Sequence, residues 1–182
     1  MTRILIFAFL LLLVSCKPKV ESTDAAASTG ADSTAVETPA VEFASPDLIA
    51  APKAGLAALT SGDIDAFVAN YAENAMYRWN NGDSLSGKKA IYDYWKNRRT
   101  NAIKTIEFSN DIWLPVKVNT PANQYQAPGN WVLSWYRTNA TYTTGKSMTQ
   151  WIHTDYHINN EGKIDLVIQY LDRAPINAAM TK

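Results

Sequence analysis

Cysteine is almost absent from this sequence, whose 182 residues contain only one, Cys16. A single cysteine excludes both a disulfide framework and a cysteine-rich zinc site. An excess of either charge is absent too, because 17 basic and 17 acidic residues give a formal net charge of +0. Proteins that bind nucleic acid carry a basic surface. The composition therefore predicts no nucleic-acid partner. Since the sequence also has no phosphate-binding loop and no metal-binding motif, we expect no cofactor and no metal.

Tryptophan and tyrosine are missing from the start of the chain, since all six tryptophans and all nine tyrosines lie at or after Tyr71. Residues 17–46 are mainly Ala, Ser, Thr, Pro and Gly, and Phe43 is their only aromatic residue. Such a segment buries too little apolar surface to offset the entropy lost on folding. We predict a disordered tether over residues 17–46 and one folded domain over residues 47–182.

The first sixteen residues have the pattern of an export signal. Arg3 precedes an apolar run over residues 4–14, which is too short to span a bilayer, and small residues follow it. The tetrapeptide Leu13-Val14-Ser15-Cys16 resembles the bacterial lipobox, which implies that Cys16 is acylated and becomes the mature N-terminus. A plain secreted protein with an incidental cysteine is the alternative. Lys17 follows the cysteine, and by resemblance to a sorting rule this predicts a lipid-anchored protein of the outer membrane, facing the periplasm or the cell surface.

The domain begins with helical patterns and continues with strand patterns. Apolar spacing and end signals predict helices over residues 47–61, 63–71 and 88–99 and a short strand over 75–79. After Asn101 the apolar period changes to two, which predicts strands around residues 106–114, 131–142, 146–158 and 163–170. Three helices followed mainly by a long antiparallel sheet indicate an α+β fold in which the helices cover one face of the sheet.

Three segments carry a resemblance to a known family. They are GLAALTSGDIDAFVANYAENAMYRW (55–79), LSGKKAIYDYWKN (85–97) and INNEGKIDLVIQYLD (158–172). Together they resemble the nuclear transport factor 2-like superfamily in its SnoaL-like and ketosteroid-isomerase-like branch. The resemblance implies a cone-shaped, curved antiparallel sheet wrapped around three N-terminal helices, a cystatin-like roll, with a pocket at its open end. Members include isomerases, dehydratases, cyclases, epoxide hydrolases and domains that only bind or dimerise, so the fold alone does not give the function.

Steroid-isomerase chemistry in that branch needs a carboxylate base, a tyrosine phenol and a protonated aspartic acid. By resemblance, the base position falls on Trp79, the phenol position on Gly55 and the acidic donor on Thr154 or Asp155. An indole cannot act as a general base at neutral pH. We therefore expect no ketosteroid-isomerase activity by this route.

Large aromatic residues are candidates for a pocket. Tyr77 and Trp79 alternate on one strand face, and Tyr94 and Trp95 lie on the third predicted helix. These rings either fill the core or line an aromatic pocket for a flat, partly apolar ligand. In the second case, polar contacts would come from one strand, at Gln150, Thr154 and Tyr156.

His153, Asp155 and His157 are the most chemically suggestive cluster. Alternate positions place them on one strand face, with neighbours about 7 Å apart. They could form an acid–base pair, a metal site or a structural contact. However, the register that turns Thr154 inward turns these three residues to the convex face, which favours a structural or interfacial role.

We therefore expect a lipid-anchored envelope domain without catalytic activity, which binds a small partly apolar molecule or a protein partner. The alternatives are a lyase or isomerase using His153 and Asp155, and a purely structural module that forms a homodimer through the convex sheet face. The third predicted helix is basic, and we expect this face to be solvated; its basic residues are Lys88, Lys89, Lys96, Arg98 and Arg99.

Overall fold

The computed structural model describes residues 37–181. Cys16, the predicted signal peptide and residues 17–36 of the predicted tether lie outside the described residues. The elements in chain order are β1 (Val41–Phe43), the 3-10 helix η1 (Pro46–Ile49), α1 (Ala50–Ser61), α2 (Ile64–Val68), β2 (Tyr71–Trp79), β3 (Ser84–Ser86), α3 (Lys88–Asn101), β4 (Ile103–Val118), β5 (Gly129–Tyr142), β6 (Ser147–Ile158), β7 (Ile164–Tyr170) and α4 (Arg173–Met180).

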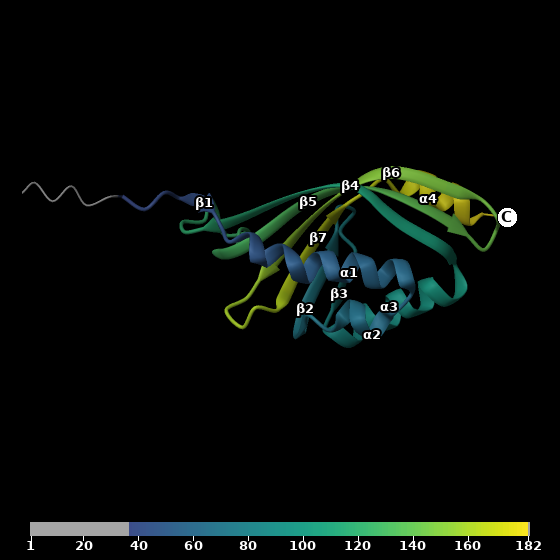
Figure 1. Cartoon of the computed structure of the whole chain (residues 1–182), viewed down its shortest axis with the longest axis horizontal. Coiled ribbons are helices and arrows are strands. Elements are labelled where there is room, and N and C mark those ends of the chain that lie inside the picture. The colour runs from purple at the N-terminus through teal and green to yellow at the C-terminus, as the bar shows by residue number, and fades with distance from the viewer. Residues whose placement is uncertain (1–36, 182) are drawn as a thin grey trace, which may run out of the picture. The chain divides into compact units, whose positions relative to one another are not determined.

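The described part of the chain is a mixed α+β fold, as predicted. A 7-stranded sheet has the strand order β1-β4-β5-β6-β7-β2-β3. Neighbouring strands are antiparallel except β2 and β7, which run parallel. Figure 1 shows the curved sheet with α1, α2 and α3 on one side of it. A bulge in β4 between Ser109 and Ile112, where Asn110 takes a φ of 55°, bends this long strand and contributes to the curvature.

Local sequence explains the paired helices at the start of the domain. α1 ends at Gly62, whose φ of 84° is a left-handed conformation that glycine adopts without a steric penalty. Asp63 then caps α2, because its carboxylate accepts a hydrogen bond of 2.9 Å from the Ala66 amide. The predicted glycine stop and aspartate cap are confirmed.

Several boundaries differ from the prediction. Part of the predicted tether is structured, since β1 pairs with Val116–Val118 of β4 and continues the sheet. β2 begins at Tyr71, a residue that helical spacing had placed in the second helix. The strand β3 and the helix α4 had no predicted counterpart. The short β1 and β3 lie at the two edges of the sheet, where few side chains are buried and the apolar pattern is correspondingly weak.

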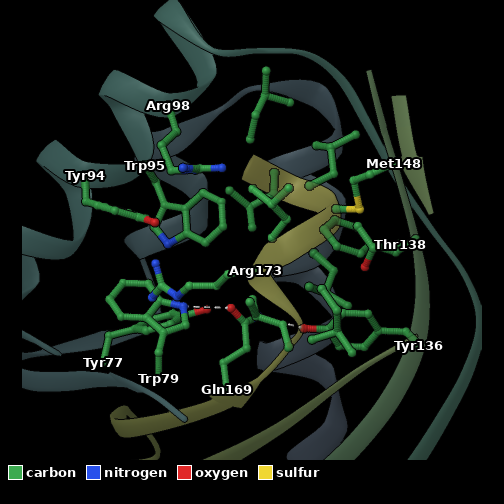
Figure 2. A pocket seen from close by; sticks show the side chains of 18 of the residues that line it. Tyr77, Trp79, Tyr94, Trp95, Arg98, Tyr136, Thr138, Met148, Gln169 and Arg173 are labelled. Carbon is green, nitrogen blue, oxygen red and sulfur yellow. Dashed lines mark hydrogen bonds between the residues drawn. The ribbon is translucent and has the colours of Figure 1, made fainter. Parts of the chain in front are cut away.

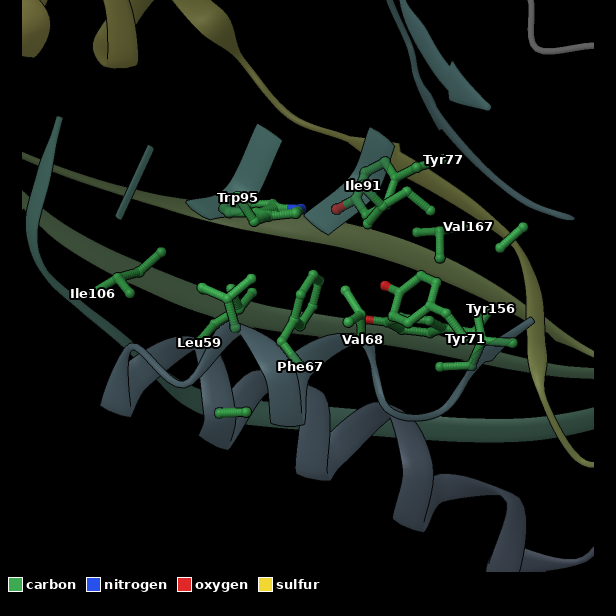
Figure 3. Packing of buried hydrophobic residues seen from close by; sticks show 14 of the residues in the cluster. Leu59, Phe67, Val68, Tyr71, Tyr77, Ile91, Trp95, Ile106, Tyr156 and Val167 are labelled. Atoms are coloured by element: carbon green, nitrogen blue, oxygen red, sulfur yellow. The ribbon is translucent and has the colours of Figure 1, made fainter. Parts of the chain in front are cut away.

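The hydrophobic core lies between the helices and the inner face of the sheet. Leu59 and Phe67 from the first two helices meet Trp95 of α3, and the sheet contributes Tyr156 and Val167 (Figure 3). Burial alternates along β5 and β6, so one face of each strand lies in this core and the other faces outward. The described residues contain no helix that is both long and apolar enough to cross a membrane.

Candidate functional site

A cavity of about 150 Å³ opens within the inner side of the domain. Helices α1 to α4 and the inner face of the sheet enclose it, and its lining is mainly aromatic and aliphatic (Figure 2). Protein interiors are close-packed and leave few voids larger than a water molecule. Ordinary packing of a hydrophobic core therefore does not account for a space of this size.

One wall of the cavity is a continuous series of aromatic rings. The ring centroids of Tyr77 and Trp79 are 4.7 Å apart, those of Trp79 and Tyr94 are 5.1 Å apart, and those of Tyr94 and Trp95 are 5.5 Å apart. Trp95 also meets Phe67 at 5.7 Å. Tilted and edge-to-face pairs at these distances are favourable, so the wall is rigid before any ligand arrives.

A buried hydrogen-bond network fixes the base of this wall. The Trp79 indole N–H donates to Gln169 Oε1 at 3.1 Å, and Gln169 Nε2 donates to Tyr136 Oη at 3.3 Å and to Thr154 Oγ1 at 3.4 Å. Tyr136 and Thr154 join their hydroxyl groups at 2.7 Å. Figure 2 shows Trp79, Gln169 and Tyr136 connected in this way. The network sets the orientation of the Gln169 amide and holds the Trp79 ring in place.

Burial keeps several phenols of the cavity in their neutral form at physiological pH. Burial raises the pKa of Tyr77 and Tyr156 well above the usual value of 10.0, and nearby phenols raise it further. Burial also raises the pKa of Tyr136, although its hydrogen bonds with Thr154 and Gln169 oppose the shift. These phenols can therefore donate hydrogen bonds but cannot serve as bases.

Two arginines stand beside the aromatic wall. The Arg98 guanidinium lies 5.6 Å from the centroid of the Tyr94 ring, and the Arg173 guanidinium lies 5.5 Å from the Trp79 ring. Arg98 comes from α3, whereas Arg173 is the first residue of α4. Both side chains are part-exposed and line the cavity, so they mark its opening toward solvent.

The sequence predicted seven pocket residues, and the structure brings most of them together. Five of the seven line the cavity: Tyr77, Trp79, Tyr94, Trp95 and Tyr156. Thr154 points inward, as predicted, but lies behind the wall in the hydrogen-bond network. The prediction that Gln150 lines the cavity is wrong. Its side-chain amide forms hydrogen bonds with the backbone N–H and C=O of Asp172, just before α4.

His153, Asp155 and His157 lie on the outer face of the sheet, as the predicted register required. His153 Nε2 is 2.9 Å from Asp155 Oδ1, and its ring stacks between Trp135 and Tyr170. His157 bonds instead to Asp165 at 2.5 Å and to the Pro128 carbonyl at 3.0 Å. The sheet separates these groups from the cavity, so they cannot act on a molecule bound inside it.

Metal ligation has no geometric basis in the described residues, since residues 37–181 contain no group of three or more His, Cys, Asp or Glu side chains placed to hold an ion. The two histidines also have separate carboxylate neighbours rather than a shared one.

A family model described as a SnoaL-like domain matches residues 53–167. The chain belongs to the SnoaL-like domain family. The match includes the first three helices, most of the sheet and the aromatic wall, but ends before Gln169 and α4. The sequence has no match among curated proteins.

Solved structures confirm the nuclear transport factor 2-like fold of this SnoaL-like domain. A nuclear transport factor 2-like protein of unknown function from Burkholderia pseudomallei has 13% identity and a TM-score of 0.61, with 76% of this chain and 100% of that chain covered. An LEH-like epoxide hydrolase of M. tuberculosis has 16% identity and a TM-score of 0.57, with 74% and 89% covered. A protein with a ketosteroid isomerase-like fold from Catenulispora acidiphila, in complex with trimethylamine, has 15% identity and a TM-score of 0.54, with 75% and 94% covered. At these identities the similarity shows the fold alone.

The positions that resemblance assigned to steroid isomerisation have other roles in this SnoaL-like domain. Gly55 lies in α1, where a Cβ would meet the Phe67 ring at 3.6 Å. Trp79 is part of the cavity wall, and Thr154 is bonded to Tyr136. Asp155, the other candidate for the acidic donor, faces away from the cavity on the outer side of the sheet.

Sequence reasoning missed Arg98, Arg173 and Gln169 as cavity residues. The expectation that the basic face of the third helix is solvated is wrong for Arg98, which lines the cavity. A usable signal was present, because Arg98 follows Ile91 and Tyr94 at helical spacing and so shares their inward face. Arg173 gave no such signal, since α4 is short and was not predicted.

Proposed function

We propose that this SnoaL-like domain binds a small, largely apolar molecule in its aromatic cavity without converting it chemically. The observation that supports binding is the empty space of about 150 Å³ beside a wall of tilted and edge-to-face aromatic rings. A dry cavity of about this volume in another protein is large enough to bind benzene. The expected ligand body is therefore about one ring in size, with room to extend through the opening.

The chemistry of the lining supports binding without turnover. The described residues that line the cavity include no Asp, Glu, His, Lys or Cys side chain. General acid–base catalysis needs a group that changes protonation near the working pH. The buried phenols of Tyr77 and Tyr156 have a raised pKa, so they cannot take this role.

Binding is tested by calorimetric titration of the domain with toluene. We expect one saturable site in the wild type and loss of that site in Ile176→Trp, because Ile176 of α4 lines the cavity and a larger ring would fill it. Val41→Trp is the matched control, since Val41 is an exposed residue of β1 away from the cavity. Toluene binding that survives Ile176→Trp, or no saturable binding in the wild type, would contradict the proposal.

The absence of turnover is tested with a 3-keto-Δ5 steroid, the substrate of the related isomerase chemistry. We expect no increase in isomerisation above the uncatalysed rate at high protein concentration, because no Asp, Glu or His side chain of the described residues lines the cavity and, by resemblance, Trp79 stands at the base position. Efficient isomerisation by the wild-type domain would overturn this part of the proposal.

The location proposed for the domain is the bacterial cell envelope, where acylated Cys16 would anchor it to the outer membrane. Support comes from the sequence alone: a signal-like start, the lipobox-like Leu13-Val14-Ser15-Cys16 and a single cysteine. Two or three acyl chains make a stable anchor where one would be marginal. Cys16→Ser should release the protein from the membrane fraction, and unchanged fractionation and mass would refute the anchor.

A second candidate function is pairing of two copies through the outer face of the sheet. One row across four strands consists of Ile112, Trp135, His153 and Tyr170, and Trp151 lies next to it. Ile112, Trp151 and Tyr170 expose 56%, 54% and 44% of their surfaces, respectively. This amount of exposed apolar surface on one face favours a protein contact.

A second copy of the chain is the occupant that we propose for this face. A two-fold interface brings one patch against itself, so the patch must tolerate its own charges. The face carries both signs, with Arg137 opposite Trp151, Arg78 on β2, and Asp155 and Asp165 on β6 and β7. We expect a dimer in analytical ultracentrifugation and a monomer for Trp151→Glu, whereas Lys89→Glu on the exposed side of α3 should remain dimeric. A wild-type monomer at all concentrations would contradict pairing.

A further inference from the structure

The charged groups of the cavity are all of one sign. Arg98 and Arg173 are the only charged side chains among the described lining residues, and no carboxylate lines the space with them. Arg173 has partners outside the cavity, since its Nη2 lies 3.1 Å from Asp83 Oδ2 and 3.2 Å from Asn81 Oδ1. The charged side chains that line the cavity are therefore all cationic, which disfavours a cationic ligand.

Arg98 differs from Arg173 because it has no carboxylate partner within the described residues 37–181. Its two terminal nitrogens approach the Met180 sulfur at 4.0 Å, which is a weak acceptor. Its charge is directed inward: burial raises the pKa of Tyr142, and the Arg98 guanidinium opposes that shift. Tyr142 lines the cavity and is buried, and Arg98 acts on it both by its charge and by a hydrogen bond, so the Arg98 guanidinium faces the same space.

Two further N–H donors near the arginines have no hydrogen-bond partner. They are the indole nitrogen of Trp95, a residue that is 8% exposed, and the Nε atom of Arg173. A buried donor without a partner costs free energy, and such donors are rare in folded proteins. Figure 2 shows Trp95, Arg98 and Arg173 on the same side of the cavity, around Tyr94. The two unsatisfied atoms on that side are both donors, and Arg98 adds a guanidinium that has only a weak sulfur acceptor.

We infer that the ligand is a small carboxylic acid in its anionic form, whose carboxylate is bound by Arg98. An ionised carboxylate only accepts hydrogen bonds and can take two from one guanidinium, which is the complement of this set of donors. Its apolar body would lie against the rings of Trp79 and Tyr94. The inference rests on the proposed function, because it names the class of molecule that the cavity binds.

Three probes of nearly the same shape separate charge from fit: benzoate, the neutral benzamide and the cationic benzamidinium. At low ionic strength we expect calorimetry to show benzoate binding about tenfold more tightly than benzamide, which corresponds to one charge-assisted contact. Benzamidinium should bind most weakly. Raising the salt concentration should weaken benzoate binding and leave benzamide binding unchanged, a result that needs no variant.

The variant Arg98→Met keeps the unbranched stem and removes the charge. We expect it to bind benzamide as the wild type does and to lose the preference for benzoate. Lys96→Met is the matched control, because Lys96 is an exposed basic residue on the same helix and does not line the cavity. It should keep the full preference.

The outcomes distinguish the inference from the proposed function. The inference of a carboxylate ligand bound by Arg98 is contradicted in two cases. One is equal binding of benzoate and benzamide by the wild type, and the other is a benzoate preference that survives Arg98→Met. The cavity then remains a binding site for neutral molecules. If none of the three probes binds but toluene does, the inference fails and the proposed binding function stands. If toluene also fails to bind, both fail.

Discussion

Two buried threonines have different roles: the hydroxyl of one stabilises the fold, and the hydroxyl of the other faces the cavity. Thr138 of β5 and Thr154 of β6 both face the inner side of the sheet and are 1% and 0% exposed. The Thr154 hydroxyl is bonded to Tyr136 and receives the Gln169 amide, whereas the Thr138 hydroxyl has no partner and lines the cavity. The first hydroxyl stabilises the fold, and the second is available to a ligand.

Valine has nearly the shape of threonine but lacks the hydroxyl. Replacing each threonine by valine therefore measures what its hydroxyl contributes to stability. Thr154→Val should lower the free energy of unfolding by about 1–3 kcal/mol, because it breaks the network that holds Gln169. Thr138→Val should leave the free energy of unfolding unchanged or raise it by up to about 1 kcal/mol. Urea unfolding measures both values, and equal destabilisation by the two variants would contradict the assignment.

Asp155 on the outer face makes stability depend on pH. Burial raises the pKa of its carboxyl above the usual 3.8, and the nearby His153 partly opposes the shift. The folded chain therefore keeps this proton at pH values where the unfolded chain has lost it. This contribution to stability is complete below about pH 3.8 and is lost as the pH rises through the folded pKa.

Asp155→Asn removes that titration. We expect the free energy of unfolding of the variant, relative to wild type, to increase as the pH is raised from about 3 to about 6. Urea unfolding at several pH values within this window measures the difference. A difference that is constant, or that decreases with pH, would show that the pair with His153 outweighs the burial of the carboxylate.

At the scale of elements, α4 is the helix that completes the cavity. It contributes Arg173, Ile176 and Met180 to the lining, yet its eight residues are too few to be helical in isolation. Asp172 caps its first turn, and Gln150 of β6 holds Asp172 by two backbone hydrogen bonds. The position of α4 therefore depends on contacts made at its start.

Asp172→Ala should loosen this helix specifically. Loss of the 2.8 Å bond to the Ala174 amide should cost about 1 kcal/mol and accelerate amide hydrogen exchange in α4, while the sheet remains protected. Asp63→Ala is the matched control, because it removes the equivalent cap of α2 and should leave exchange in α4 as it is in the wild type. Unchanged exchange in α4 of Asp172→Ala would mean that packing alone holds the helix.

The elements differ in how far sequence could predict them. The α1–α2 pair has a glycine stop, an aspartate cap and a regular apolar stripe, and the long strands β5 and β6 alternate clearly between buried and outward positions. α4 buries only Ala179 fully, so its sequence carries almost no apolar pattern. The aromatic rings were recognised, but whether they fill a core or leave a cavity depends on distances between elements, which periodicity does not encode.

At the scale of the whole domain, the sheet separates two surfaces with different chemistry. Its inner face, together with the helices, encloses the aromatic cavity and the two arginines. Its outer face carries the stack of Trp135, His153 and Tyr170 and an exposed apolar row. The proposed ligand and the proposed second copy of the chain would therefore occupy opposite sides of the sheet.

Methyl NMR of the domain titrated with toluene distinguishes a binding cavity from a filled aromatic core. We expect saturable shifts, with one dissociation constant, for cavity methyl groups such as those of Met148 and Ile152. The methyl groups of Ile112 on the outer face should not shift. Shifts confined to the outer face, or no saturable shift in the cavity, would contradict the account.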